Sequence, residues 1–310
     1  MRDFCSRAPA LVRGFLRERT FVIPCLVVAS GFFAALCIFA PGARAQDEPS
    51  AKLVWKPPSA FQAVPGISAA PKCDLGAVLA KAGERSTELL DRLQNFDAHE
   101  RVQFERTDAH GNSLLYLRGR FDYQVDFGEP TSVFQVHETR EPIGRGNDSG
   151  LAGEIDRGLA ALVLVLHPTL QPDFEMHCDG FVRRRGRGAF VVSFAQIAGK
   201  PPRAITLIAG AQRYPIRVRG RAWIAADTGD VIHLETYLME PVPELGLRSD
   251  ATSIEYAPVK FQTKAVELWL PQSATVWANY GKRRTIIEHT FSNFQLFWVD
   301  TRQVVAEPHE

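Results

Sequence analysis

Two histidine–carboxylate pairs are the residues of this chain whose types and spacing could carry chemistry. His233 and Glu235 alternate along a strand-like segment, and so do His177 and Asp179. Side chains two residues apart share one face of a strand, so each pair could place an imidazole beside a carboxylate. Such a pair could transfer protons or bind a metal ion. The alternative is the half-exposed polar face of a sheet, which is the commoner situation.

Local motifs of known enzyme classes are absent from the sequence. The eight histidines form no His-Glu-x-x-His pattern, and the chain has no Gly-x-Ser-x-Gly turn and no phosphate-binding glycine loop. Gly144-Arg145-Gly146 lacks the flanking strand and helix of a dinucleotide site. We therefore expect no catalytic residue, no metal site and no cofactor. An envelope hydrolase built on the polar strand pairs is the weakest of the alternatives considered.

Seven arginines form two groups that could bind an anionic partner. The groups are Arg183, Arg184, Arg185 and Arg187 in a glycine-containing turn, and Arg217, Arg219 and Arg221 on one face of a strand. A guanidinium group offers a fork of donors to a carboxylate or phosphate. The alternative is a solvated hairpin tip and an exposed sheet face. The formal net charge of +1 gives no reason to expect nucleic acid as a partner.

Aromatic side chains are the candidates for contact with an apolar ligand. The chain has 20 Phe and 5 Trp, enough for a sizeable core or an apolar cavity. Concave apolar pockets are the usual sites for small ligands. The candidates for ligand contact are Trp223, Trp269, Trp277, Phe291, Phe294 and Trp298. Filling of the core is the alternative role for the same side chains.

Residues 1–45 have the composition of a secretion signal. Arginines precede an apolar run at 20–40, and Ala43-Arg44-Ala45 places small residues at the two positions that a signal peptidase reads. We predict cleavage after Ala45 and a periplasmic or extracellular protein. The alternative is an uncleaved inner-membrane anchor, since a run of about 20 apolar residues can span a bilayer.

Two cysteines remain in the predicted mature chain. Cys5, Cys25 and Cys37 lie in the signal region, which leaves Cys73 and Cys178. An even pair in an oxidising compartment favours a disulfide. The alternative is two unpaired thiols, with Cys178 packed on a strand.

The mature chain begins with a proline-rich linker at 46–72, whose apolar residues indicate that it lies along the domain surface. Residues 74–96 carry apolar side chains at a 3.6-residue period, which predicts an amphipathic helix capped by Asp74. A second, largely buried helix is expected at 151–166. Most other segments alternate like strands, and Asp227-Thr228-Gly229-Asp230 closes a hairpin.

These elements predict a mainly β (α+β) fold. We expect a single domain over 73–300 and a tail at 301–310. Its antiparallel sheet would curl into a half-open β-barrel, covered by the N-terminal amphipathic helix and by the inserted second helix.

The hairpin also resembles a known family. Residues 219–229 read Arg-Gly-Arg-Ala-Trp-Ile-Ala-Ala-Asp-Thr-Gly. This resembles the G-x-A-W-I-D-x-x-T-G hairpin of the lipoprotein-carrier superfamily of LolA/LolB/RseB-like exported proteins, with Ala225 at the position of the Asp. Residues 254–259 and 268–271 are similar to a later segment of the same proteins. The resemblance covers residues 89–299.

The resemblance implies an exported, non-enzymatic binding protein. Such a protein would carry or sense a lipid, an acylated protein or another apolar ligand in the cell envelope. The alternative that the superfamily also implies is an interaction or sensor module that binds an envelope protein. Contact with a membrane would be transient, or would run through an uncleaved N-terminal anchor.

Overall fold

The computed structural model describes residues 52–59, 62–69, 71–92, 95–127, 136–146, 148, 150–151, 158–209, 212–261 and 266–297. By its contacts the chain divides into Met1–Ser50 and Ala51–Glu310. The expected signal peptide and the tail at 301–310 lie outside the described residues. Within the described part, no helix is both long and apolar enough to cross a membrane.

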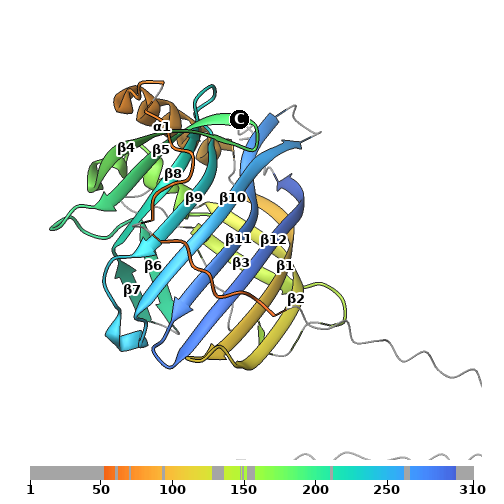
Figure 1. Ribbon diagram of the computed structural model, residues 1–310. Coiled ribbons are helices and arrows are strands. Elements are labelled where there is room, and N and C mark those ends of the chain that lie inside the picture. Colours follow the sequence, from red (N-terminus) through yellow and green to blue (C-terminus); the bar gives the residue numbers. More distant parts are fainter. Residues whose placement is uncertain are drawn as a thin grey trace, which may run out of the picture. The chain divides into compact units, whose positions relative to one another are not determined.

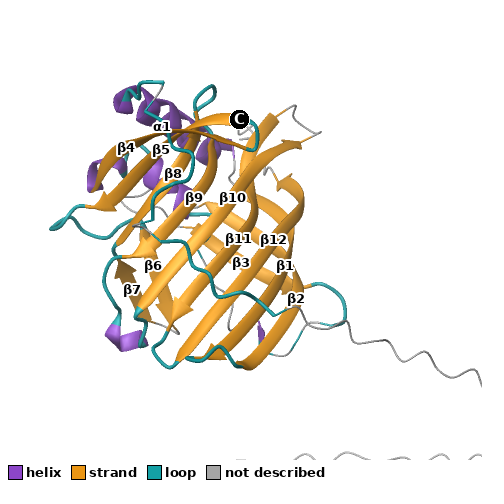
Figure 2. Cartoon of the chain, in the orientation of Figure 1, coloured by secondary structure: helices purple, strands orange, loops and turns teal. Residues whose placement is uncertain are grey.

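Ten strands form one antiparallel sheet (Figures 1 and 2). In spatial order they are β3 (Val136–Pro142), β2 (Ser113–Phe127), β1 (Asn95–Asp108), β12 (Arg283–Phe297), β11 (Val266–Asn279), β10 (Ser249–Phe261), β9 (Val231–Leu238), β8 (Val218–Ala225), β5 (Arg187–Gln196) and β4 (Phe174–Arg184). Among the described strands, β3 and β4 are the two edges, so the sheet curls without closing. The predicted half-open antiparallel architecture is confirmed. A separate two-stranded sheet pairs β6 (Ile205–Ala209) with β7 (Gln212–Ile216).

The predicted hairpin joins β8 to β9. Ala225 N–H donates to the Asp230 carbonyl and Gly229 N–H to the Ala225 carbonyl, each at 2.8 Å. Gly229 has a φ of +81°, a left-handed conformation that glycine adopts at low cost. The turn chemistry seen in the sequence therefore selects this hairpin.

Helix α1 spans Leu75–Arg92. Asp74 caps it, since its Oδ1 accepts a hydrogen bond of 3.1 Å from the Ala77 N–H. The expected end at Phe96 is wrong, because Phe96 belongs to β1 and pairs with β2 and β12. Two neighbouring strands supply the backbone partners of this segment, so strand pairing replaces a further helical turn.

The described part of the expected second helix at 151–166 contains a short 3₁₀ helix and no α-helix. Residues 152–157 lie outside the described residues, and Leu162–Leu166 form a short 3₁₀ helix, η2. All five of its residues are buried. A continuous apolar run has no period, so the sequence could indicate burial but could not identify the type of element.

Two long strands of the sheet each contain a proline. β10 runs through Pro258, and β11 runs through Pro271. A register shift between Glu255 and Tyr256 places Tyr256 opposite Pro271. Irregularities of this kind let a strand contain a proline, which cannot donate a ladder hydrogen bond.

The two faces of the sheet have different covers. The inner face packs against α1 and the plug, which we define as residues 159–170. The outer face is crossed by the strap, residues 52–59 and 62–69, which runs in front of the strands in Figure 1. Leu53 N–H donates to Glu105 at 2.7 Å, and Ser68 exchanges two backbone hydrogen bonds with Phe181. The described parts of the proline-rich segment therefore lie along the sheet.

Cys73 and Cys178 form a disulfide, with an S–S distance of 2.00 Å and a Cα–Cα distance of 6.5 Å. The bond joins the residue before the Asp74 cap to the edge strand β4. The predicted pairing is confirmed.

Candidate functional site

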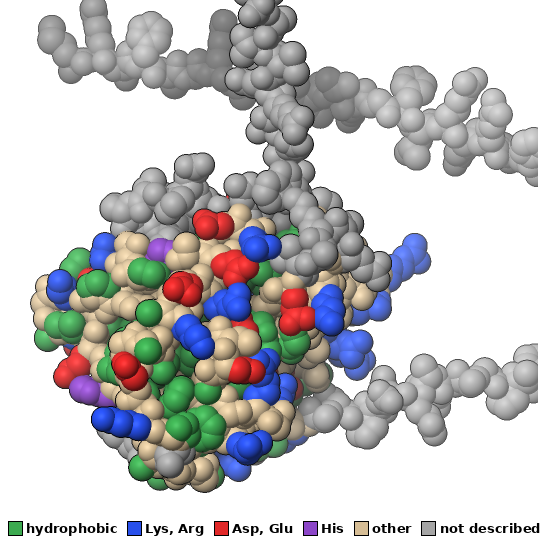
Figure 3. Space-filling view, turned by 90° about the horizontal axis from the view of Figure 1, so that it is seen from above, with side chains coloured by type: hydrophobic (Ala, Val, Ile, Leu, Met, Phe, Trp, Pro, Cys, Tyr) green, Lys and Arg blue, Asp and Glu red, His purple; other side chains and the backbone are tan. Residues whose placement is uncertain are grey.

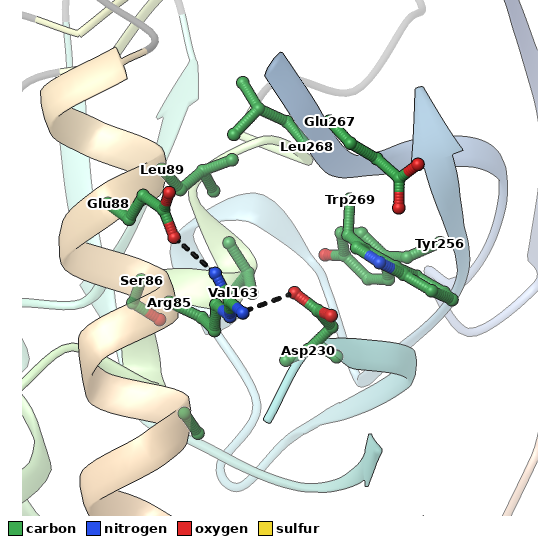
Figure 4. A pocket seen from close by; sticks show the side chains of 12 residues that line it. Arg85, Ser86, Glu88, Leu89, Val163, Asp230, Tyr256, Glu267, Leu268 and Trp269 are labelled. Carbon is green, nitrogen blue, oxygen red and sulfur yellow. Dashed lines mark hydrogen bonds and ion pairs between the residues drawn. The ribbon is translucent and has the colours of Figure 1, made fainter. Parts of the chain in front are cut away.

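A small cavity lies where α1 meets the ends of β9, β10 and β11 (Figure 4). Its volume is about 40 Å³, and its lining includes Leu89, Val163, Tyr256 and Trp269. A water molecule needs about 10–15 Å³ of such space, whereas sites for small ligands usually measure 300–1,000 Å³. The cavity can therefore hold a few waters, and an acyl chain requires more room.

Polar contacts join α1 to the β8–β9 turn beside this cavity. The Arg85 guanidinium lies 2.5 Å from Glu88 and 3.6 Å from Asp230, and also donates to the Thr228 carbonyl at 3.1 Å (Figure 4). Lys81 Nζ donates to the Asp227 carbonyl at 3.0 Å. These lysine and arginine side chains are exposed or partly exposed, and the surface seen from above carries both signs of charge (Figure 3). The contacts form a polar seam at the edge of an apolar interior.

The plug fills the inner face behind that seam. Its buried side chains are Leu159, Ala160, Leu162, Val163, Leu164, Val165, Leu166 and Leu170. Gln171, which follows the plug, donates to the Leu79 carbonyl of α1 at 3.1 Å and to the Leu166 carbonyl at 2.6 Å. In this arrangement the plug packs directly against the inner face of the sheet.

A charged cluster is buried on the same face, on strands β1, β3 and β12. We call Glu100, Glu138, Arg140 and His289 the inner polar cluster. Arg140 donates to the two oxygens of Glu100 at 2.6 and 3.2 Å, and His289 Nδ1 lies 2.7 Å from Glu100 Oε1. Burial favours a raised pKa of Glu100, but His289 and Arg140 outweigh it and the pKa is lowered. Glu100 is therefore held as an anion.

Glu138 connects this cluster to the plug. One of its oxygens accepts the Gly158 N–H at 2.9 Å and the other accepts the Ala160 N–H at 3.3 Å. Arg140 Nη1 is farther from it, at 3.6 Å. Burial strongly raises the pKa of Tyr123, whose hydroxyl lies near Glu138 without a well-directed hydrogen bond in the described part of the chain.

On the outer face, the expected neighbours His233 and Glu235 do meet, and Glu255 joins them. His233 Nε2 lies 3.2 Å from Glu235 and Nδ1 lies 3.0 Å from Glu255, although the second contact is poorly directed for a hydrogen bond. Trp223 covers the imidazole, at 4.5 Å between ring centroids. Both ring nitrogens of His233 therefore face carboxylates of the chain itself.

The second expected pair is more open. His177 Nε2 lies 3.3 Å from Glu175, and Asp179 accepts a hydrogen bond of 2.8 Å from Ser193. These residues line a cleft of about 300 Å³ on the outer face, together with Tyr237. Among the described residues, no group of three or more His, Cys, Asp or Glu is arranged to hold a metal ion.

Most of the seven arginines bind groups of the same chain. Arg184 and Arg185 contact Glu255, Arg187 contacts Asp227, Arg217 contacts Glu240, and Arg221 donates to the Gln62 carbonyl of the strap. A guanidinium group already paired with a carboxylate has fewer donors left for an external anion. These arginines therefore contribute to the packing of the outer face and the strap.

The candidate aromatic residues are distributed over both faces. Phe291 is buried in the main core, 5.2 Å from Tyr123 between ring centroids, and Phe294 is half-buried against Phe96. Trp269 lines the cavity beneath α1. Trp223 belongs to a smaller apolar cluster with Val182, Ala189, Val191, Ala225 and Ile232.

Two further candidates have no ligand-facing role that the structure describes. The half-buried Trp277 has an indole N–H without a hydrogen-bond partner among the described residues. Trp298 lies outside the described residues.

Sequence reasoning missed the inner polar cluster. One signal was present: Phe96, Ala98, Val102 and Phe104 alternate as buried residues, and Glu100 occupies the same apolar phase of the strand. A carboxylate in that position must find partners inside the fold.

Comparison with solved structures finds several similar chains, all at low sequence identity. The chain is similar to a DUF1329 family protein from Desulfovibrio piger, with a TM-score of 0.37 and 12% identity over 73% of this chain and 93% of that one. An outer membrane lipoprotein-sorting protein domain from Vibrio parahaemolyticus gives a TM-score of 0.36 and 10% identity over 74% and 95%. A LolA superfamily protein from Nitrosomonas europaea gives 0.31 and 12% over 72% and 94%. No family model and no curated protein matches the sequence.

Proposed function

We propose that this chain is an exported, non-enzymatic binding protein of the cell envelope, and that it carries a lipid or an acylated protein. The apolar chain of the ligand would lie on the inner face of the half-barrel, in the place of the plug. The observation that carries this proposal is the plug itself. It is a run of buried aliphatic side chains, and its backbone takes no part in the ladders of the sheet.

The plug is held mainly by apolar contacts. Its hydrogen bonds from backbone to backbone are local, such as Leu164 N–H to the Ala161 carbonyl at 3.0 Å and His167 N–H to the Leu164 carbonyl at 2.9 Å. Burial of the five residues of η2 contributes about 8–15 kcal/mol, at about 1.5–3 kcal/mol per side chain. An acyl chain of about 16 carbons gains about 13 kcal/mol, at about 0.8 kcal/mol per buried CH₂. For η2, which is one part of the plug, the exchange of protein side chains for an acyl chain is therefore close to balanced.

The polar seam is the place where an acyl chain could enter to replace the plug. Partly exposed ion pairs such as that between Arg85 and Asp230 contribute about 0–1 kcal/mol each, far less than the apolar core. Separation of α1 from the β8–β9 turn would open the cavity at Tyr256 and Trp269 first. This is the point at which an apolar chain would reach the plug.

Two measurements test the proposal. Mature protein purified from envelopes is expected to contain lipid, detected by solvent extraction and mass spectrometry. Addition of an apolar fluorescent probe to delipidated protein is expected to increase hydrogen–deuterium exchange in residues 158–170, while exchange in the central strands stays unchanged. Absence of both lipid and probe binding would contradict carriage, and binding without faster exchange in the plug would contradict the inner-face site.

The second candidate function is an envelope protein-interaction or sensor module. It is favoured by the filled inner face, where the cavity at α1 measures only about 40 Å³. The same experiments separate the two functions, because an interaction module is expected to be free of lipid and to keep its plug protected.

A further inference from the structure

The inner polar cluster lies at the start of the plug, where the head of a bound ligand would lie. The geometry points to a head-group site there. This inference rests on the proposed function and names the ligand class: an acyl chain whose uncharged head donates hydrogen bonds through a hydroxyl or an amide N–H. A free carboxylate or phosphate would be disfavoured.

The charges of the cluster give the first reason. Arg140 is the one permanent cation among its four members, and it donates two hydrogen bonds to Glu100. Glu138 is 3.6 Å from the nearest Arg140 nitrogen and supplies a second negative charge. The cluster therefore holds two carboxylates for one guanidinium group. A carboxylate head would bring another negative charge into a buried site, where like charges repel strongly.

The backbone donors of Glu138 give the second reason. Its carboxylate accepts hydrogen bonds from the N–H of Gly158, the residue before the plug, and from the N–H of Ala160, within the plug. Displacement of the plug removes these donors. A buried acceptor left without a donor costs about 1–3 kcal/mol, and a charged one costs more. A ligand that occupies the site must therefore bring donors of its own.

The imidazole of His289 gives a third, independent reason. Its side chain has no exposed surface, and its Nε2 atom has no hydrogen-bond partner in the described part of the chain. Nδ1 lies 2.7 Å from Glu100, so the tautomer that donates to Glu100 leaves Nε2 as an acceptor. Nε2 is therefore a buried acceptor in addition to the two oxygens of Glu138, and a donating head group would supply a hydrogen bond that such acceptors lack.

The experiment compares probes of one chain length below their aggregation concentrations, by displacement of a fluorescent apolar probe from the mature protein at pH 8. Monopalmitoylglycerol supplies hydroxyl donors, palmitamide supplies an amide donor, methyl palmitate supplies acceptors only, and palmitate supplies a carboxylate. We expect the two donor heads to bind at least 10-fold more tightly than palmitate, and methyl palmitate to lie between. The better of the two donors identifies a hydroxyl-bearing lipid or an amide-bearing acylated chain as the source.

Variants locate the preference in the cluster. Glu138→Gln removes the negative charge of the second carboxylate. The variant is expected to reduce the preference for the donor heads over palmitate from 10-fold to below 3-fold, mainly because palmitate binds more tightly. Glu244→Gln, at an exposed position far along the chain, is the matched control and should keep it.

Three outcomes would overturn the head-group site. A wild-type protein that binds palmitate as tightly as the donor heads would overturn it while leaving carriage intact, and this comparison needs no variant. A preference unchanged in Glu138→Gln would also overturn it. Failure of all four probes to bind would overturn carriage as well.

Discussion

Glu100 and His289 lie 2.7 Å apart on the neighbouring strands β1 and β12, and neither side chain has any exposed surface. The two residues are separated by 189 positions in the sequence. Their contact joins the strand that comes first along the chain to the strand that comes last. The stability of this buried pair depends on Arg140, which donates hydrogen bonds to both carboxylate oxygens of Glu100.

Arg140→Met should destabilise the protein strongly. The substitution keeps apolar volume but leaves Glu100 and Glu138 buried without their cation, and loss of one partner of a buried ion pair costs about 3–5 kcal/mol. Urea unfolding measures the change in the free energy of unfolding. Arg145→Met, at an exposed position, is the control and should change it by less than about 0.5 kcal/mol. A loss below about 1 kcal/mol for Arg140→Met would contradict the role assigned to Arg140.

Removal of the disulfide should lower the stability of the whole domain. Cys73 and Cys178 are separated by 105 residues, and a loop of about 100 residues corresponds to about 4.7 kcal/mol in the chain-entropy model. We expect Cys73→Ala combined with Cys178→Ala to lose about 2–5 kcal/mol. Thermal unfolding with and without reductant measures the effect. Reductant should lower the midpoint of the wild type and leave that of the double variant unchanged, and equal midpoints for the wild type would contradict the prediction.

The fold was predictable wherever local chemistry decides the element. The turn at Gly229 needs a left-handed residue, and Asp74 offers a cap just before an amphipathic period. Both signals are read over a few residues, and both features are present. The helix end at Phe96 was missed because pairing of β1 with β2 and β12 decides it, and those strands lie elsewhere in the sequence.

The candidate site was less predictable because it depends on strand register. Glu100 and His289 become neighbours only when β1 pairs with β12, and Glu138 joins them only through β2 and β3. The sequence places His233 and Glu235 on one face, but it cannot show that Glu255 from β10 closes the other side. Contacts within one strand are therefore predictable, whereas contacts between strands require the fold.

Two glycine substitutions should change stability in opposite directions. A Cβ at Gly220 would lie 2.1 Å from the Glu235 carbonyl oxygen and 2.4 Å from the Phe194 ring, and backbone atoms cannot move aside cheaply. Gly220→Ala should therefore cost about 1–3 kcal/mol or more. A Cβ at Gly76 of α1 meets nothing closer than 3.5 Å, so Gly76→Ala should stabilise by about 0.5–1 kcal/mol. Urea unfolding measures the change in the free energy of unfolding of both variants. No loss of stability in Gly220→Ala would contradict the close approach of Gly220 to Glu235 of β9.

The contribution of His233 to stability should depend on pH. Burial lowers the pKa of His233, but Glu235 and Glu255 outweigh it and the pKa is raised. Burial raises the pKa of Glu255, but His233 and Arg184 lower it to about 2. The histidine contribution is therefore complete below its unfolded pKa of about 6.5 and is lost as the pH rises through the raised value. The Glu255 contribution is complete above about pH 4.5 and is lost as the pH falls toward 2.

We expect His233→Asn to destabilise the protein more at pH 5.5 than at pH 9 in urea unfolding. The exposed His110→Asn variant should show no such difference, and a larger loss for His233→Asn at pH 9 would contradict the ion-pair arrangement.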